Sequence, residues 1–138
     1  MNRVVLDTGP LVALLNARDA YHPWALEVFA EITPPLLTCE SVISEACFLL
    51  RRTNHGPDAA LELIDRGVIA LAFSAADEMR SVRQLMRRYE ALPMSLADAC
   101  LVRMTELDAR ATVLTIASHF STYRRNGRQR IPVITPDT

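Results

Sequence analysis

Three acidic residues are candidates for a functional site, because each interrupts or borders an apolar segment of the sequence. Asp7 ends a short β-branched run and precedes a Gly-Pro turn, Glu45 interrupts an apolar segment, and Asp98 begins another apolar segment. Each has a simpler explanation when taken alone. Asp7 can cap a helix, Glu45 can occupy a boundary position with its carboxylate in water, and Asp98 can favour a helix N-terminus through the helix dipole.

Taken together, the three carboxylates indicate a metal site. Acidic groups gathered at one end of a sheet repel one another unless a cation lies between them. Oxygen ligands, without His or Cys at metal-ligand spacing, favour a hard ion such as Mg²⁺ or Mn²⁺. Such an ion polarises a phosphoryl oxygen and activates water, which suits hydrolysis of a phosphodiester.

Rival chemistries lack their residues. All 15 basic residues are arginine, so there is no lysine for a Schiff base, a P-loop or a receiver domain. The glycines form neither a GxGxxG nor a GxxxxGK motif. Gly9 stands where an aspartyl-nucleophile phosphatase needs a second acid, and no G-x-S-x-G elbow is present.

The elements that must position these residues alternate between strands and helices, which indicates an α/β fold with a mainly parallel sheet of about four to five strands. We expect strands at residues 4–6, 36–38, 68–73, 111–115 and 131–135. We expect helices at residues 11–16, 23–33, 40–52, 59–65, 75–89, 96–108 and 118–125. The apolar run 68–73 predicts a strand buried on both faces. Because ligands bind at the carboxyl ends of parallel strands, Asp7 and Thr115 become site candidates.

Composition predicts a single domain spanning residues 1–138. The chain has 138 residues and is 50% hydrophobic, enough for one core. Its net charge of −1 hides an acidic body and a basic end, since residues 110–138 hold five arginines and one acid. No apolar run is long enough for a membrane span. Three cysteines without CxxC spacing predict buried free thiols in a reducing cytoplasm.

Five ordered blocks resemble PIN-domain ribonucleases of the VapC-like toxin group. They are VVLDTGPLVAL at residues 4–14, SVISEA at 41–46, PMSLADA at 93–99, VLTIASHF at 113–120 and YRRNGRQRIP at 123–132. The resemblance implies a three-layer α/β/α domain and Mg²⁺- or Mn²⁺-dependent endoribonuclease activity. It also implies a homodimer in the cytoplasm and a small antitoxin as partner. By similarity, Asp7 and Asp98 are the principal metal ligands, and Glu45 helps to hold the metal or to position water.

The chain departs from this family at one position. The family usually carries a fourth acid in the block after the fourth strand, and Ala117 stands in its place. Ser118 is adjacent but is expected to point elsewhere. Two hypotheses follow: a ribonuclease whose activity is reduced, or a catalytically impaired module that binds an antitoxin or RNA. A nuclease for processing or repair is a third, weaker alternative.

Other residues are supporting candidates. Thr8 and Thr115 lie beside the predicted site, where their hydroxyls can orient a metal-bound water, although strand and turn preferences explain them equally well. Arg124, Arg125 and Arg128 belong to the basic end and are candidates for binding an RNA backbone. The alternative for these arginines is a solvated helix terminus. Arg80, Arg83 and Arg87 are expected to form a solvated helix face.

Overall fold

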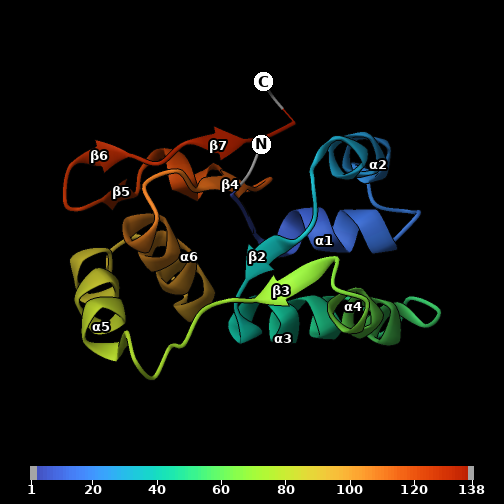
Figure 1. Cartoon of the computed structure of the whole chain (residues 1–138), viewed down its shortest axis with the longest axis horizontal. Coiled ribbons are helices and arrows are strands. Elements are labelled where there is room, and N and C mark those ends of the chain that lie inside the picture. Colours follow the sequence, from blue (N-terminus) through green and yellow to red (C-terminus); the bar gives the residue numbers. More distant parts are fainter. Residues whose placement is uncertain (1–2, 137–138) are drawn as a thin grey trace.

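A parallel sheet lies at the centre of the computed structural model, which describes residues 3–136 (Figure 1). Its strands pair in the order β3-β2-β1-β4-β7, and every pairing is parallel. Their bounds are β1 (Val4–Leu6), β2 (Leu36–Thr38), β3 (Ile69–Leu71), β4 (Thr112–Leu114) and β7 (Val133–Ile134). A separate antiparallel hairpin joins β5 (Arg124–Arg125) to β6 (Gln129–Arg130).

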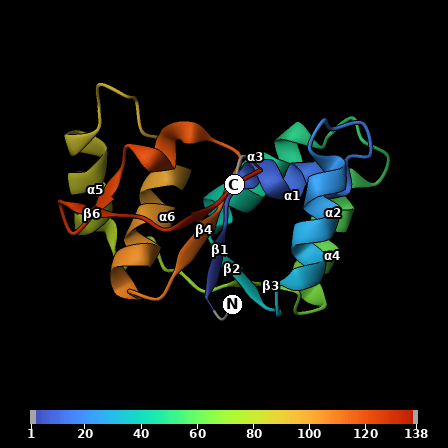
Figure 2. The ribbon, with the colours of Figure 1, turned by 90° about the horizontal axis from the view of Figure 1, so that it is seen from above.

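Helices cover both faces of the sheet (Figure 2). They are α1 (Thr8–Leu15), α2 (His22–Glu31), α3 (Glu40–Leu49), α4 (Gly56–Asp65), α5 (Met79–Arg88) and α6 (Leu96–Leu107), with a short 3-10 helix η1 (Ser118–Ser121). Side chains alternate along β1: Val5 packs in the core shared with α5 and α6, whereas Val4 and Leu6 pack in the core shared with α1. The predicted three-layer α/β/α architecture is therefore confirmed.

A strand forms within residues 68–73, but the prediction that it is buried on both faces is wrong. β3 spans Ile69–Leu71 at one edge of the sheet, and Leu71 is 40% exposed. An apolar run of six does not by itself distinguish a central strand from an edge strand, because partners on both sides come from distant parts of the chain.

Two predicted helices are also wrong in extent. The helix expected at residues 75–89 begins only at Met79, because Ser74 closes a turn by accepting a hydrogen bond from Asp77 N at 3.2 Å. The helix expected at 118–125 is η1 followed by the β5 strand. The hairpin then turns at Asn126 and Gly127, whose φ values of 52° and 83° match the pattern of a type I′ turn.

The parallel register brings the loops that carry the acidic residues to one edge. Val5 lies opposite Leu37 of β2 and Val113 of β4, so β1, β2 and β4 end at similar heights. The Thr38 hydroxyl donates to Leu6 O at 2.8 Å and fixes the end of β1 against β2. Within residues 3–136, no helix combines the length and apolar character needed to cross a membrane.

Candidate active site

Asp7 is the buried acid at the end of the central strand. Its side chain is the N-cap of α1, where Oδ1 accepts from Thr8 N at 2.8 Å, and Oδ2 accepts from the Thr115 hydroxyl at 2.6 Å. Burial raises the pKa of Asp7, and the nearby carboxylates of Asp98 and Glu45 raise it further, against the lowering effect of the two hydrogen bonds. Capping therefore explains only part of this residue, since a buried carboxylate facing other acids is costly without a cation.

Asp98 faces this position from the first turn of α6. Ser95 caps that helix by accepting from Asp98 N at 3.0 Å, as its spacing predicts. The Tyr123 hydroxyl donates to Asp98 Oδ2 at 2.8 Å, and His119 Nδ1 lies 3.7 Å from the same oxygen. Asp98 Oδ1 accepts no hydrogen bond from any residue in the described part of the chain, so this oxygen is available to a ligand.

The end of β4 is tied to Asp7 by a short relay of hydrogen bonds. Ala117 N donates to the Thr115 hydroxyl oxygen at 3.0 Å, and that hydroxyl in turn donates to Asp7. Residue 117, where the resemblance leads us to expect a fourth acid, therefore belongs to a loop that is anchored on the buried acid through Thr115. The hydroxyl of Thr8, the residue that follows Asp7, is buried with no partner among residues 3–136.

Glu45 is less closely placed. It lies on α3 with its side chain exposed, and it contributes the smallest of the charge effects on the pKa of Asp7. Within residues 3–136, no three His, Cys, Asp or Glu side chains are grouped closely enough to hold a metal ion as they stand. Of the two acids whose charge raises the pKa of Asp7, Asp98 thus has the larger effect and Glu45 the smaller.

The oxygen donors at this site are of the type that a hard cation prefers. Asp7 and Asp98 supply carboxylate oxygens, Asp98 Oδ1 is free, and the unpartnered Thr8 hydroxyl adds a neutral oxygen. The residues therefore fit a divalent ion such as Mg²⁺ or Mn²⁺.

Tyr123, the aromatic residue that holds Asp98, is not among the site residues predicted from the sequence. The Tyr123 ring is 1% exposed and packs edge-on against Tyr89 and Phe120, with ring centroids 5.1 Å and 5.3 Å apart. This packing fixes the hydroxyl that holds Asp98. Tyr123 lies 25 residues from Asp98 and belongs to no helical or strand pattern shared with it. Its place in the last resembling block is the one signal that points to it.

The structure separates the three arginines expected to bind RNA. Arg124 Nη1 donates to the carbonyl oxygens of Ser121, Thr122 and Tyr123, and Arg125 Nη1 donates to Ala109 O. Both guanidinium groups thus stabilise the backbone around η1 and the end of α6. Arg128, in contrast, is exposed in the turn of the hairpin.

Comparisons with known proteins show the family and the fold of this chain. The family model of the PIN domain matches residues 4–120. The crystal structure of Mycobacterium tuberculosis VapC20, a toxin that cleaves the sarcin–ricin loop, matches with a TM-score of 0.78 and 25% sequence identity. That match covers 86% of this chain and 93% of VapC20. A comparison with curated proteins finds no match. The chain belongs to the PIN domain family, and its structure is VapC-like.

Proposed function

We propose that this chain is a Mg²⁺- or Mn²⁺-dependent endoribonuclease and the toxin of a toxin–antitoxin pair. The observation that carries the proposal is the pairing of buried Asp7 with Asp98 at the carboxyl edge of the sheet, beside two threonine hydroxyls. The VapC-like fold supports RNA as the substrate class. It also supports a small antitoxin as partner, a homodimer as the assembly and the cytoplasm as the location.

Each residue of the site has a distinct task in this proposal. Asp7 and Asp98 hold the divalent ion, which supplies phosphoryl polarisation and a water of lowered pKa when it is bound. Glu45 approaches from α3 to hold the ion or to orient water. Thr115 keeps the Asp7 carboxylate in one orientation. Tyr123 is a positioning residue, because it acts through Asp98 and leaves one Asp98 oxygen for the ion.

The direct test of the proposal is RNA cleavage by an Asp98→Asn variant. The change keeps the shape of the side chain and removes the charge that holds the ion, so we expect cleavage to fall about 100-fold or more, equivalent to roughly 3 kcal/mol. Gel analysis of labelled RNA with Mn²⁺ or Mg²⁺ measures it. Asp58→Asn, an exposed acid in the first turn of α4, is the matched control and should cleave normally. Equal cleavage by parent and Asp98→Asn proteins would contradict the proposal.

The positioning role of Tyr123 is tested by Tyr123→Phe. The ring packing remains, but Asp98 loses its donor, and loss of such an outer-shell partner costs roughly 10- to 100-fold in metal affinity. Calorimetric titration with Mn²⁺ measures this affinity. Tyr89→Phe is the control, because Tyr89 packs on the same ring but its hydroxyl accepts from Arg124 N at 2.9 Å. If both variants weaken Mn²⁺ binding equally, the role of Tyr123 is only to fill the core.

Ala117 favours a second candidate function, a PIN-fold module that binds RNA or an antitoxin but cleaves poorly. We expect Ala117→Asp to tighten Mn²⁺ binding and to raise cleavage by about tenfold or more, since a further carboxylate adds charge to the ligand set. Ser118→Asp, the same charge change on the neighbouring exposed residue, is the control. Identical Mn²⁺ affinity and cleavage in the two variants would show that the vacancy at 117 does not limit the site.

A further inference from the structure

Helix α5 carries an unusual concentration of positive charge. Arg80, Arg83, Arg87 and Arg88 lie within its ten residues, which include no acid. All four side chains are exposed, and none forms an ion pair or side-chain hydrogen bond with another residue in the range 3–136. Arginines in the last turn favour the helix dipole, but this does not account for Arg80 and Arg83 near the first turn.

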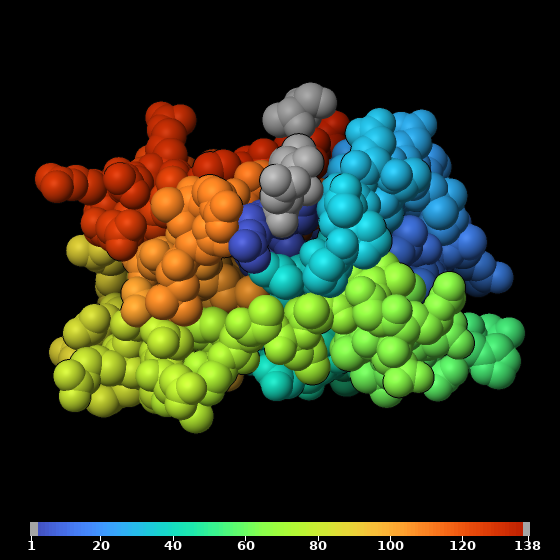
Figure 3. Space-filling model, in the orientation of Figure 1, coloured from blue at the N-terminus to red at the C-terminus, as the bar shows by residue number. Residues whose placement is uncertain are grey.

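The β5–β6 hairpin brings further arginines to the same end of the molecule. Arg128 and Arg130 are exposed and, among the described residues, unpaired. Arg130 lies directly across the hairpin from Arg124, a like-charged pairing that is unfavourable in a two-stranded ladder. Figure 3 shows the red C-terminal segment projecting from the surface above the yellow-green segment that contains α5.

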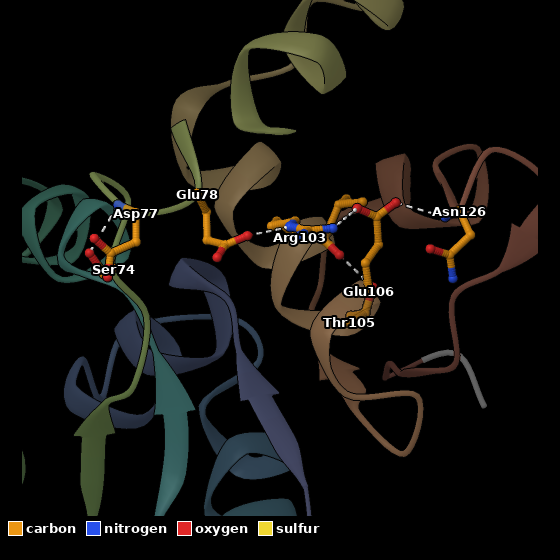
Figure 4. Close-up of polar contacts among 8 residues, drawn as sticks. Ser74, Asp77, Glu78, Arg103, Thr105, Glu106 and Asn126 are labelled. Atoms are coloured by element: carbon orange, nitrogen blue, oxygen red, sulfur yellow. Dashed lines mark hydrogen bonds and ion pairs between the residues drawn. The ribbon is translucent and has the colours of Figure 1, made fainter. Parts of the chain in front are cut away.

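The two elements meet at the turn of the hairpin. A Cβ built on Gly127 would lie 3.3 Å from Arg88 Nη1, so the guanidinium of Arg88 rests against the turn that carries Arg128. Asn126 N also donates to Glu106 Oε2 at 2.7 Å, which fixes the turn to α6 (Figure 4). Arg88 therefore joins α5 to the hairpin turn, and the arginines of both elements lie at the same end of the molecule.

The acids beneath this surface are already occupied. Arg103 forms ion pairs with Glu78 at 2.7 Å and with Glu106 at 3.2 Å, and Glu106 also accepts from Asn126 (Figure 4). These contacts leave the outer arginines without carboxylates to neutralise them. Glu90, just beyond α5, is an acid that lines the same hollow as Arg87 and Arg88. The excess positive charge thus remains directed to solvent.

We propose that this arginine surface, formed by Arg83, Arg87, Arg88, Arg128 and Arg130, binds the phosphate backbone of RNA. Arginine offers forked donors that match phosphate oxygens, and a backbone track requires no base-specific contacts. This inference rests on the proposed function, since it assigns a docking surface for the substrate of the carboxylate site.

The arginine surface and the carboxylate site are close to each other in the sequence. Tyr123, whose hydroxyl holds Asp98, is followed directly by Arg124, the first residue of the hairpin. The hairpin that carries Arg128 and Arg130 thus begins directly after the residue that holds Asp98. Arg124 and Arg125, in the first strand of this hairpin, donate to backbone carbonyls and so stabilise the hairpin's attachment to the rest of the fold.

The experiment is RNA binding by an Arg88→Gln/Arg128→Gln double variant. Fluorescence anisotropy with a labelled single-stranded RNA in EDTA measures binding without cleavage. We expect the double variant to bind about tenfold more weakly at low salt. We also expect the slope of log affinity against log salt to fall by about 1.4, near 0.7 for each lost phosphate contact. The matched control is Arg18→Gln/Arg52→Gln, a pair that lines a different surface pocket of about 560 Å³.

The outcomes separate this inference from the proposed function. A parent protein that fails to bind RNA, or a double variant with the affinity and salt slope of the control, would overturn the inference. Unchanged RNA binding with altered self-association by light scattering would also overturn it, because the surface would then be a protein interface. Salt-dependent binding that is lost in the double variant, in a parent that does not cleave RNA with Mn²⁺, would support the inference and contradict the proposed function.

Discussion

The buried carboxylate of Asp7 is the constraint on which the rest of this structure depends. An acid at the end of the central strand loses hydration, and a second acid faces it from α6, so burial and repulsion both raise its pKa. The fold holds the carboxylate there with a hydroxyl from β4 and a backbone amide from α1. We expect a cation to bind at this site, because it would neutralise the buried carboxylate. Without the cation, the ionised carboxylate lowers the stability of the fold.

Sequence reasoning could locate this constraint because its signals are local. Asp7 follows a strand, Asp98 follows its cap Ser95, and both elements are found where their patterns predict. The parallel order of the sheet explains why separate strand ends meet at one edge. Local patterns do not predict how exposed a residue is in the folded chain. β3 is an edge strand, and Glu45 is exposed on its helix.

The region after β4 shows most clearly where prediction from local sequence patterns fails. A helix is expected at residues 118–125, but the structure has a 3-10 helix followed by a hairpin. Tyr123 packs in the core against the distant Tyr89 and against Phe120 of η1. This packing places its hydroxyl on Asp98, and a contact with residues so far along the chain has no local signal in the sequence.

The nearly neutral net charge of the chain conceals two opposite surfaces. In our proposals, the carboxylates of Asp7 and Asp98 bind a cation and the arginines of α5 and the hairpin bind the phosphates of RNA. A nuclease needs both, because its substrate is a polyanion and its ion must be held among acids. The absence of lysine leaves phosphate binding to arginine, whose forked geometry favours a fixed backbone track.

The most direct test of this account is thermal unfolding of the parent and Asp7→Asn proteins with and without Mn²⁺. Because the pKa of Asp7 is raised on folding, its ionisation reduces stability as the pH rises above the ordinary carboxyl range. Without metal, the variant should therefore have a higher melting temperature than the parent at neutral pH, by roughly 2–4 °C for each kcal/mol gained in the free energy of unfolding. This difference in melting temperature should disappear in acid. Mn²⁺ should raise the melting temperature of the parent well above its effect on the variant. A metal-free parent that melts above the variant, with equal or no response of the two proteins to Mn²⁺, would contradict the account.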